Sequence, residues 1–174
     1  MSSAYLHDLT VDLLLAAEAA LDPLCTGNEL PPRRYVHFGE PAWDLCQGDE
    51  AIASSGQLVA WWGNVESVVT AVGNRCAVQY RAQLCVELAR CYPDLGSDSQ
   101  PLPPAVYEGA AAILDTDTWA LVRGVGAWLA GIDCEWRAMD PVVPSGPQGG
   151  MAGVRVCVRL SLNDLDPLCT PPGP

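Results

Sequence analysis

Apolar residues recur along the chain with two different spacings, and these spacings divide it into helices and strands. Between residues 4 and 21, leucine and alanine return every three or four positions, as on the apolar face of a helix. Pro23 and Gly27 should end that helix. Residues 105–131 repeat the helical spacing, with a possible break at 115–118, where residues that favour helix caps gather. The pattern therefore predicts two helices.

Strict alternation of apolar and polar residues predicts strands in the rest of the chain. The longest run is 76–90, and shorter runs cover 33–38, 132–140 and 154–163. Segment 57–63, which is mostly apolar, is also predicted to be a strand. Segment 64–74 is ambiguous, because it could extend the strand before it or form a short edge. One face of the long strand should contact the core, while the other faces water or a partner.

The predicted order is α-β-β-β-α-β-β, which is an α+β fold. Consecutive strands should be mostly antiparallel, so we expect a twisted antiparallel sheet with two helices packed on one face. A length of 174 residues fits one domain, and neither a repeat nor a linker divides it. Segments 26–32, 45–56 and 141–153 are expected to be loops, and residues 164–174 a poorly ordered tail.

The charge balance narrows the range of partners. The formal net charge is −12, and all nine basic residues are arginines. Such a chain lacks the basic surface by which proteins hold nucleic-acid phosphates. An acidic surface would still allow DNA to pass close by, because it repels the phosphates and so does not bind them. No apolar run is long enough for a membrane span, and the N-terminal region lacks the basic start of a secretory signal.

The cysteines allow more than one interpretation. There are eight of them, no two have C-x-x-C spacing, and the chain has only two histidines, His7 and His37, so a clustered zinc site is not indicated. The simplest interpretation is that most are small buried hydrophobic residues. One disulfide and a metal site are the alternatives.

Candidate catalytic residues are few. The chain has no nucleophile elbow, phosphate-binding loop or zinc-protease motif. His37 lies in a predicted strand, with no nucleophile near it in sequence. Three acidic groups could hold a divalent cation, but a helix cap or a solvated surface explains each more simply. They are Asp115 with Asp117, Asp133 with Glu135, and Glu40 with Asp44, Asp49 and Glu50. We therefore predict no catalytic residue, metal ligand or cofactor.

Two short motifs in a fixed order carry a family resemblance. "RRYVHFGEPAWD" at 33–44 is followed by "QLVAWW" at 57–62, a long strand ending in "RCYP" at 90–93, a long helix, and a closing hairpin near 149–159. Over roughly residues 4–163 this resembles the tail terminator proteins of long-tailed, siphovirus-type phages of actinobacteria. The inserted "LCQGDEAIASSG" at 45–56 departs from the family pattern by separating the two motifs more widely.

The resemblance implies a structural virion protein and not an enzyme. Tail terminators form rings, typically hexamers, that cap the finished tail tube, stop its polymerisation and meet a head-side connector or stopper protein. Genomic DNA then passes through the lumen without specific binding. The resemblance also implies assembly in the host cytoplasm, a place at the head–tail junction and no membrane contact.

Other functions remain open. One is a different head–tail joining ring subunit, such as a stopper or tail-completion protein. A tail-tube subunit is less suited to the long helix at 105–131. A small acidic ligand-binding or enzymatic domain would need a deep pocket with convergent polar groups.

The residues expected to contact another subunit or a partner come from the turn after 33–38, the wet strand faces and the 141–153 loop. They are Trp43, Asp44, Arg81, Glu87, Pro144, Gly146, Gln148, Met151, Arg155 and Arg159. Trp43 should hold its turn against the body of the domain. The 141–153 loop should reach a neighbouring subunit or ring.

Overall fold

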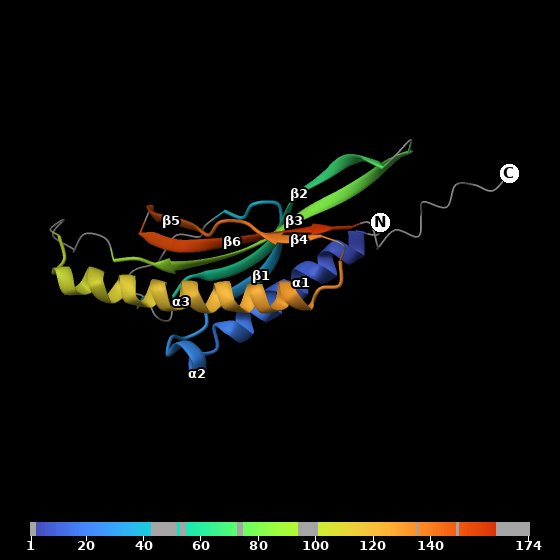
Figure 1. The fold of residues 1–174 in the computed structure, drawn as a ribbon. Helices are drawn as coiled ribbons and strands as arrows, with labels where there is room; N and C mark the ends of the chain where they lie inside the picture. Colours follow the sequence, from blue (N-terminus) through green and yellow to red (C-terminus); the bar gives the residue numbers. More distant parts are fainter. Residues whose placement is uncertain are drawn as a thin grey trace.

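The computed structural model describes residues 3–42, 52, 55–72, 75–93, 101–134, 136–148 and 150–162. Its elements are α1 (Ser3–Ala20), α2 (Pro23–Thr26), β1 (Arg33–Phe38), β2 (Gln57–Val72), β3 (Arg75–Cys91), α3 (Pro104–Gly131), β4 (Arg137–Met139), β5 (Val143–Gln148) and β6 (Met151–Ser161). The strands form one sheet in the order β1-β2-β3-β6-β4, and β5 also pairs with β6. Helices α1 and α3 cover one face of it (Figure 1). The predicted α+β fold is therefore confirmed.

The core lies between these two helices and the sheet. Every second residue of β3 from Leu84 to Leu88 and of β6 from Val154 to Leu160 points into it, in a register that sets Leu84 opposite Val158 and Val86 opposite Val156. The helices contribute Leu9, Leu13, Leu14, Ala17, Leu21, Ala120, Leu121, Val125 and Leu129. Each large apolar side chain buried there contributes roughly 1.5–3 kcal/mol to folding. The predicted alternation is thus confirmed over 84–88 and 154–160.

The two long helices approach each other closely at Gly124 of α3. A Cβ atom on this glycine would lie 2.3 Å from Cβ of Ala20 in α1. Only the missing side chain allows the helices to pack at this distance.

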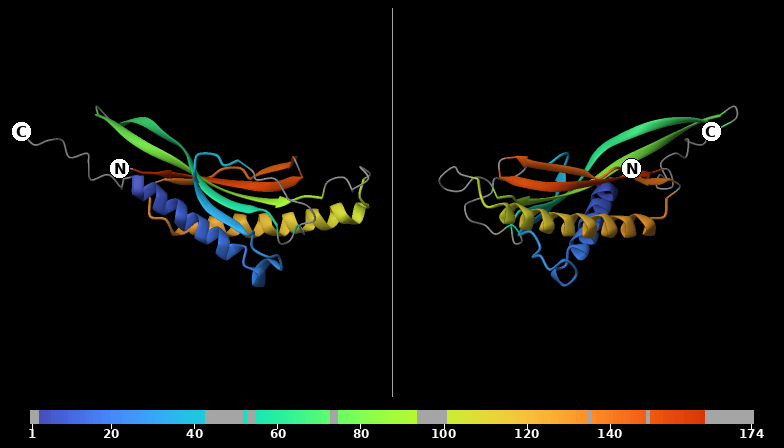
Figure 2. Two further views of the ribbon diagram at one scale, coloured as in Figure 1. Left: turned by 180° about the vertical axis from the view of Figure 1, so that it is seen from behind. Right: turned by 60° about the vertical axis from the view of Figure 1, so that its left-hand side comes forward.

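Strands β2 and β3 continue past the helices as a two-stranded arm (Figures 1 and 2). Strand β1 accompanies β2 only as far as Trp62, and β6 accompanies β3 only from Arg81. Residues 67–72 and 75–80 pair with each other, and no other described strand pairs with them. Segment 64–72 therefore extends its strand. A two-stranded ribbon is only marginally stable alone in water.

Strand β1 corrects the expectation of antiparallel neighbours, because it runs parallel to β2, with Arg33 opposite Gln57. Parallel strands need a connection of about a dozen residues or more, which carries the chain back to the starting end of the sheet. The segment 39–56 is long enough to do this. The loop predicted within it, at 45–56, did not indicate this parallel return of the chain.

The closing part of the chain also differs from the prediction. The expected loop at 141–153 is wrong, because β5 forms a hairpin with β6. Gly150, with a φ of 74°, lies in the turn, and Pro144 fits β5 because edge strands tolerate proline. The strand expected at 132–140 is reduced to β4, and α3 continues through 115–118 without a break.

A further short helix, α2, follows α1. The Asp22 carboxylate accepts a hydrogen bond from the Leu24 N–H at 2.8 Å, and Gly27, with a φ of 75°, ends the turn. The proline and glycine that were predicted to end α1 therefore also shape this extra turn, which exposes Leu24.

Candidate partner-binding surface

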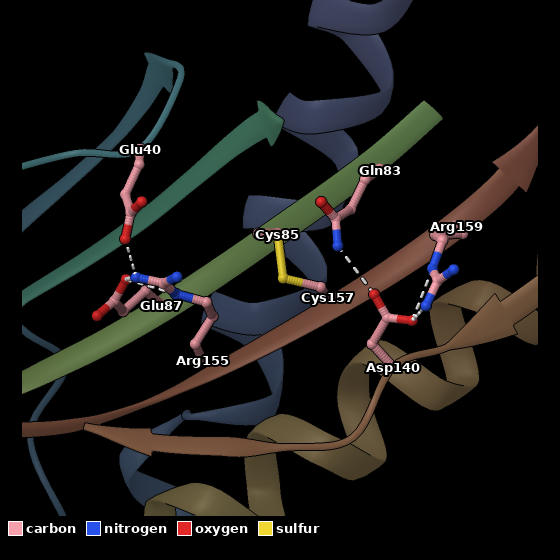
Figure 3. The surroundings of a disulfide bond; sticks show 8 residues. All are labelled: Glu40, Gln83, Cys85, Glu87, Asp140, Arg155, Cys157 and Arg159. Atoms are coloured by element: carbon pink, nitrogen blue, oxygen red, sulfur yellow. Dashed lines mark hydrogen bonds and ion pairs between the residues drawn. A yellow bond between two sulfur atoms is a disulfide. The ribbon is translucent and has the colours of Figure 1, made fainter. Parts of the chain in front are cut away.

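The face of the sheet opposite the helices carries most of the charged strand residues. It presents Trp61 from β2, the alternate residues Arg81, Gln83, Cys85 and Glu87 of β3, and Arg155, Cys157 and Arg159 of β6. We call this surface the polar face. Figure 3 shows its centre, where two clusters of charged side chains lie on either side of a disulfide.

The disulfide joins Cys85 of β3 to Cys157 of β6, which lie opposite each other in the ladder with Cα atoms 4.1 Å apart. Trp61 packs with it, and all three residues are buried. The disulfide that the sequence left open as an alternative is therefore present between these two of the eight cysteines. Their places in alternating strands were visible in the sequence, but their pairing depends on the strand register. Cys25 and Cys134 are free thiols.

The first charged cluster is centred on Arg155. Its guanidinium donates from Nε to Glu87 at 3.2 Å and also contacts Glu40. Glu87 is only 1 % exposed, so its charge is held by this partner. Burial alone would lower the pKa of Arg155, but the carboxylates of Glu87 and Glu40 outweigh it and raise that pKa. The guanidinium also lies 5.2 Å from the centre of the Trp61 ring.

The second cluster is centred on Asp140, which follows β4. Its carboxylate accepts from Arg159 Nε at 2.7 Å and from Gln83 Nε2 at 2.9 Å. Burial raises the pKa of Asp140, but these two hydrogen bonds and the charge of Arg159 prevail and lower it. The cluster ties β3, β6 and the end of β4 together.

Arg81 completes the row of arginines on the polar face. Its guanidinium carbon lies 4.4 Å from the centre of the Trp136 ring. In the ladders it stands opposite Ser161 of β6 and Glu66 of β2. With Asn64, Gln83 and other neighbours it lines an open hollow of about 180 Å³.

On the helix side of the sheet, exposed apolar residues gather where the arm leaves the body. Phe38 of β1 contacts Trp62 of β2 edge to face, with ring centres 5.3 Å apart. Val65 and Tyr80 follow on the same face of β2 and β3, since they stand opposite Ala82 and Ser67. We call these four residues the arm-foot patch. Phe38 is 77 % exposed, Val65 48 % and Tyr80 43 %.

Another group of charges lies inside the domain and has a structural role. Arg90 of β3 donates from Nε to Asp117 of α3 at 3.0 Å and from Nη1 to the Ser55 carbonyl. Asn28 donates to the second Asp117 oxygen at 2.8 Å. Both charged residues are fully buried. The interpretation of Asp117 as a helix cap or cation ligand with Asp115 is therefore wrong.

The structure brings together only some of the residues expected to contact partners. Glu87 pairs with Arg155, while Arg81 and Arg159 line the same hollow. The others are placed separately: Pro144 and Gly146 are exposed in β5, the Gln148 backbone pairs with Met151, Met151 itself is buried, and Trp43 and Asp44 lie outside the described residues.

Several residues of these surfaces were missed by sequence reasoning. Phe38 and Trp62 were interpreted as strand residues, and nothing local shows that they meet in adjacent strands. Gln83 and Asp140 are 57 positions apart in the chain. Only the strand pairing brings them within hydrogen-bonding distance.

The described residues offer little for catalysis. No group of three or more metal-ligating side chains comes together among them. His37 is exposed, and its Nδ1 lies 3.1 Å from the Gly39 carbonyl oxygen. A wider depression of about 310 Å³ lies over the disulfide, and its charged residues Glu40 and Arg155 already pair with each other.

Comparison with known proteins adds no relative: no protein-family model matches this chain, and neither does any curated protein. Among the described helices, none has the length and apolar character needed to cross a membrane.

Proposed function

We propose that this chain is a structural subunit that joins copies of itself in a closed ring, and that the ring is the tail terminator of a long-tailed phage. In this role it caps the tail tube, stops its polymerisation and meets the head-side connector, while DNA passes through the lumen. The proposal combines the motif resemblance with the surfaces of the domain.

The observation that carries the proposal is the projecting arm with the arm-foot patch at its base. Exposed aromatic and apolar side chains that lie together on a rigid sheet are typical of protein contact sites. The arm extends them past the helices, where a neighbouring subunit can reach both of its faces (Figure 2). A marginal two-stranded ribbon would also gain stability from such a neighbour.

The distribution of exposed apolar residues favours a ring over a two-fold dimer. The arm lies at one end of the molecule, and the start of α3, with exposed Val106, lies at the other (Figure 1). Contacts between two different surfaces of identical subunits are head-to-tail contacts, and they close into a ring when the rotation permits.

The charge of the chain is compatible with DNA passage. Each copy carries a formal charge of −12, so an assembly of several copies is strongly acidic. Acidic groups around a lumen repel a polyanion and so prevent it from sticking.

The test is to measure the mass of the purified chain by light scattering behind a sizing column and to image the peak by negative stain. We expect rings of about six times the chain mass of 18.5 kDa. Added to growing tail tubes, they should hold tube length constant. A protein that neither forms rings nor binds or caps tubes would overturn the proposal and favour the ligand-binding alternative.

A further inference from the structure

Three arginines stand in a row on the polar face, and two of them have carboxylate partners. Arg155 holds Glu87 and Glu40, and Arg159 holds Asp140. Arg81 is different, because no described carboxylate lies within ion-pair distance of its guanidinium. Its Nε is buried and has no hydrogen-bond partner among the described residues. A buried donor left in this state costs about 1–3 kcal/mol.

The surroundings of Arg81 are arranged to hold the guanidinium in place. The guanidinium carbon lies 4.4 Å from the centre of the Trp136 ring. This contact restrains the side chain, and it uses none of the N–H donors of the guanidinium. Ser161, opposite Arg81 in the ladder, has a second buried polar atom, Oγ, without a partner among the described residues. The irregular pairing between Trp62 and Val65 places Asn64 beside the same hollow. Irregularities of this kind are common next to binding sites.

We propose that this hollow, lined by Asn64, Glu66, Arg81, Gln83 and Arg159, binds a carboxylate side chain from a second copy of the chain. The inference rests on the proposed ring and names one of its contacts. Arginine binds a carboxylate through two parallel charge-assisted hydrogen bonds, and one of these would satisfy the Nε donor that has no partner among the described residues of the single subunit.

A second copy is the occupant that fits the charges. The chain has 21 acidic residues against nine arginines, so each copy carries many carboxylates without a basic partner. The hollow lies where β2 and β3 leave the body as the arm, since residues 64, 66 and 81–83 line it and β6 accompanies β3 only from Arg81. A single carboxylate meets one like charge in the hollow, at Glu66, and the apolar contact of the arm can bring it there, whereas a nucleic-acid strand would bring a run of phosphates against a chain with a net charge of −12.

The experiment compares the self-association of four full-length chains by sedimentation velocity over a range of concentrations. They are wild type, Arg81→Ala, Glu66→Gln and the control Arg123→Ala. The control removes the same charge from an exposed position on α3.

We expect Arg81→Ala to weaken association about 10-fold or more, because the partner carboxylate loses its charged ligand. Arg123→Ala should stay within twofold of wild type. Glu66→Gln should strengthen association several-fold, because it removes a like charge from the hollow.

The outcomes separate this inference from the proposed function. Association of Arg81→Ala that matches the control overturns the inference, as does a wild-type chain that stays monomeric. If such a chain still caps tail tubes, the terminator function stands without this contact. Association that depends on Arg81 without tube capping supports the contact and rejects the terminator role. Should Arg81→Ala fail to fold, Arg81→Lys, which keeps the charge but loses the paired donors, serves in its place and should weaken association less.

Discussion

At the scale of single residues, the buried pair of Arg90 and Asp117 shows how one contact can hold several segments. It joins β3 to α3, and its partners Asn28 and Ser55 precede β1 and β2. Removing one member of a buried pair leaves the other charge without compensation. Asp117→Ala should therefore lower the free energy of unfolding by about 3–5 kcal/mol.

Urea denaturation measures this effect, and Asp115→Ala is the matched control. Asp115 lies two positions earlier in the same helix and is exposed, so its replacement should change stability by less than about 0.5 kcal/mol. Equal effects of the two substitutions would show that the buried pair is not required.

Asp140 leads to a prediction about pH. Hydrogen bonds from Arg159 and Gln83 lower the pKa of this carboxyl group in the folded state. The stability it contributes is present above its unfolded pKa of about 3.9 and is lost as the pH falls through the lower folded value.

Asp140→Asn should thus be less stable than wild type at pH 7, and this difference in stability should disappear toward pH 2. Urea midpoints measured across this range test the prediction. A difference in midpoint between variant and wild type that does not change with pH would contradict it. The control is Asp133→Asn, at an exposed position, which should have the same midpoint as wild type.

At the scale of elements, the packing of α1 on α3 allows a test by two glycines of one helix. Replacing glycine by alanine inside a helix normally stabilises it by about 1 kcal/mol. Gly109→Ala should do so, because nothing lies within 4 Å of the added Cβ. Gly124→Ala should instead destabilise the domain by about 1–3 kcal/mol, because its Cβ would clash with Ala20. Thermal unfolding of both variants should show shifts of opposite sign. A stabilising Gly124→Ala would mean that the helices can separate at little cost.

The disulfide between β3 and β6 is a second feature at this scale. It joins residues 72 positions apart, so it restricts the unfolded chain strongly. Replacing both Cys85 and Cys157 by alanine should lower the free energy of unfolding by about 2–4 kcal/mol. Cys25→Ala, which removes an exposed free thiol, should have little effect. A loss below about 0.5 kcal/mol in the double variant would show that the strand pairing does not depend on the bond.

The elements also show which parts of the fold can be predicted from sequence. Helical and strand periodicity located α1, α3, β3 and β6, because each buries one long face in the core. The same local pattern cannot say which strands are neighbours. The parallel pairing of β1 and the contact of Gln83 with Asp140 depend on which strands are neighbours, so they were missed. The local pattern also predicted a loop at 141–153, although the resemblance implied a closing hairpin near 149–159. The polar face was predicted only in part, through Arg81, Glu87, Arg155 and Arg159.

At the scale of the whole molecule, the two faces of the sheet have different tasks. The face on the helix side packs against α1 and α3 to form the core. Beyond these helices, β2 and β3 continue as the arm, which neither helix covers (Figure 2). The polar face neutralises its buried charges internally around Glu87 and Asp140, so it can meet another protein without uncompensated buried carboxylates. Association of such acidic chains then needs apolar contact to overcome their mutual repulsion.

The arm-foot patch is the surface best suited to supply that contact. Replacing Phe38 and Val65 together by serine should leave the fold intact, because both side chains are largely exposed. It should raise the dissociation constant of the assembly about 10- to 100-fold, since buried aromatic anchors dominate interface energies. Leu15→Ser is the control, because Leu15 is a similarly exposed apolar residue on α1, away from the arm. Sizing-column light scattering should then show smaller species for the double variant alone. Unchanged rings in that variant would move the subunit contact away from the arm and leave the projecting ribbon without its proposed partner.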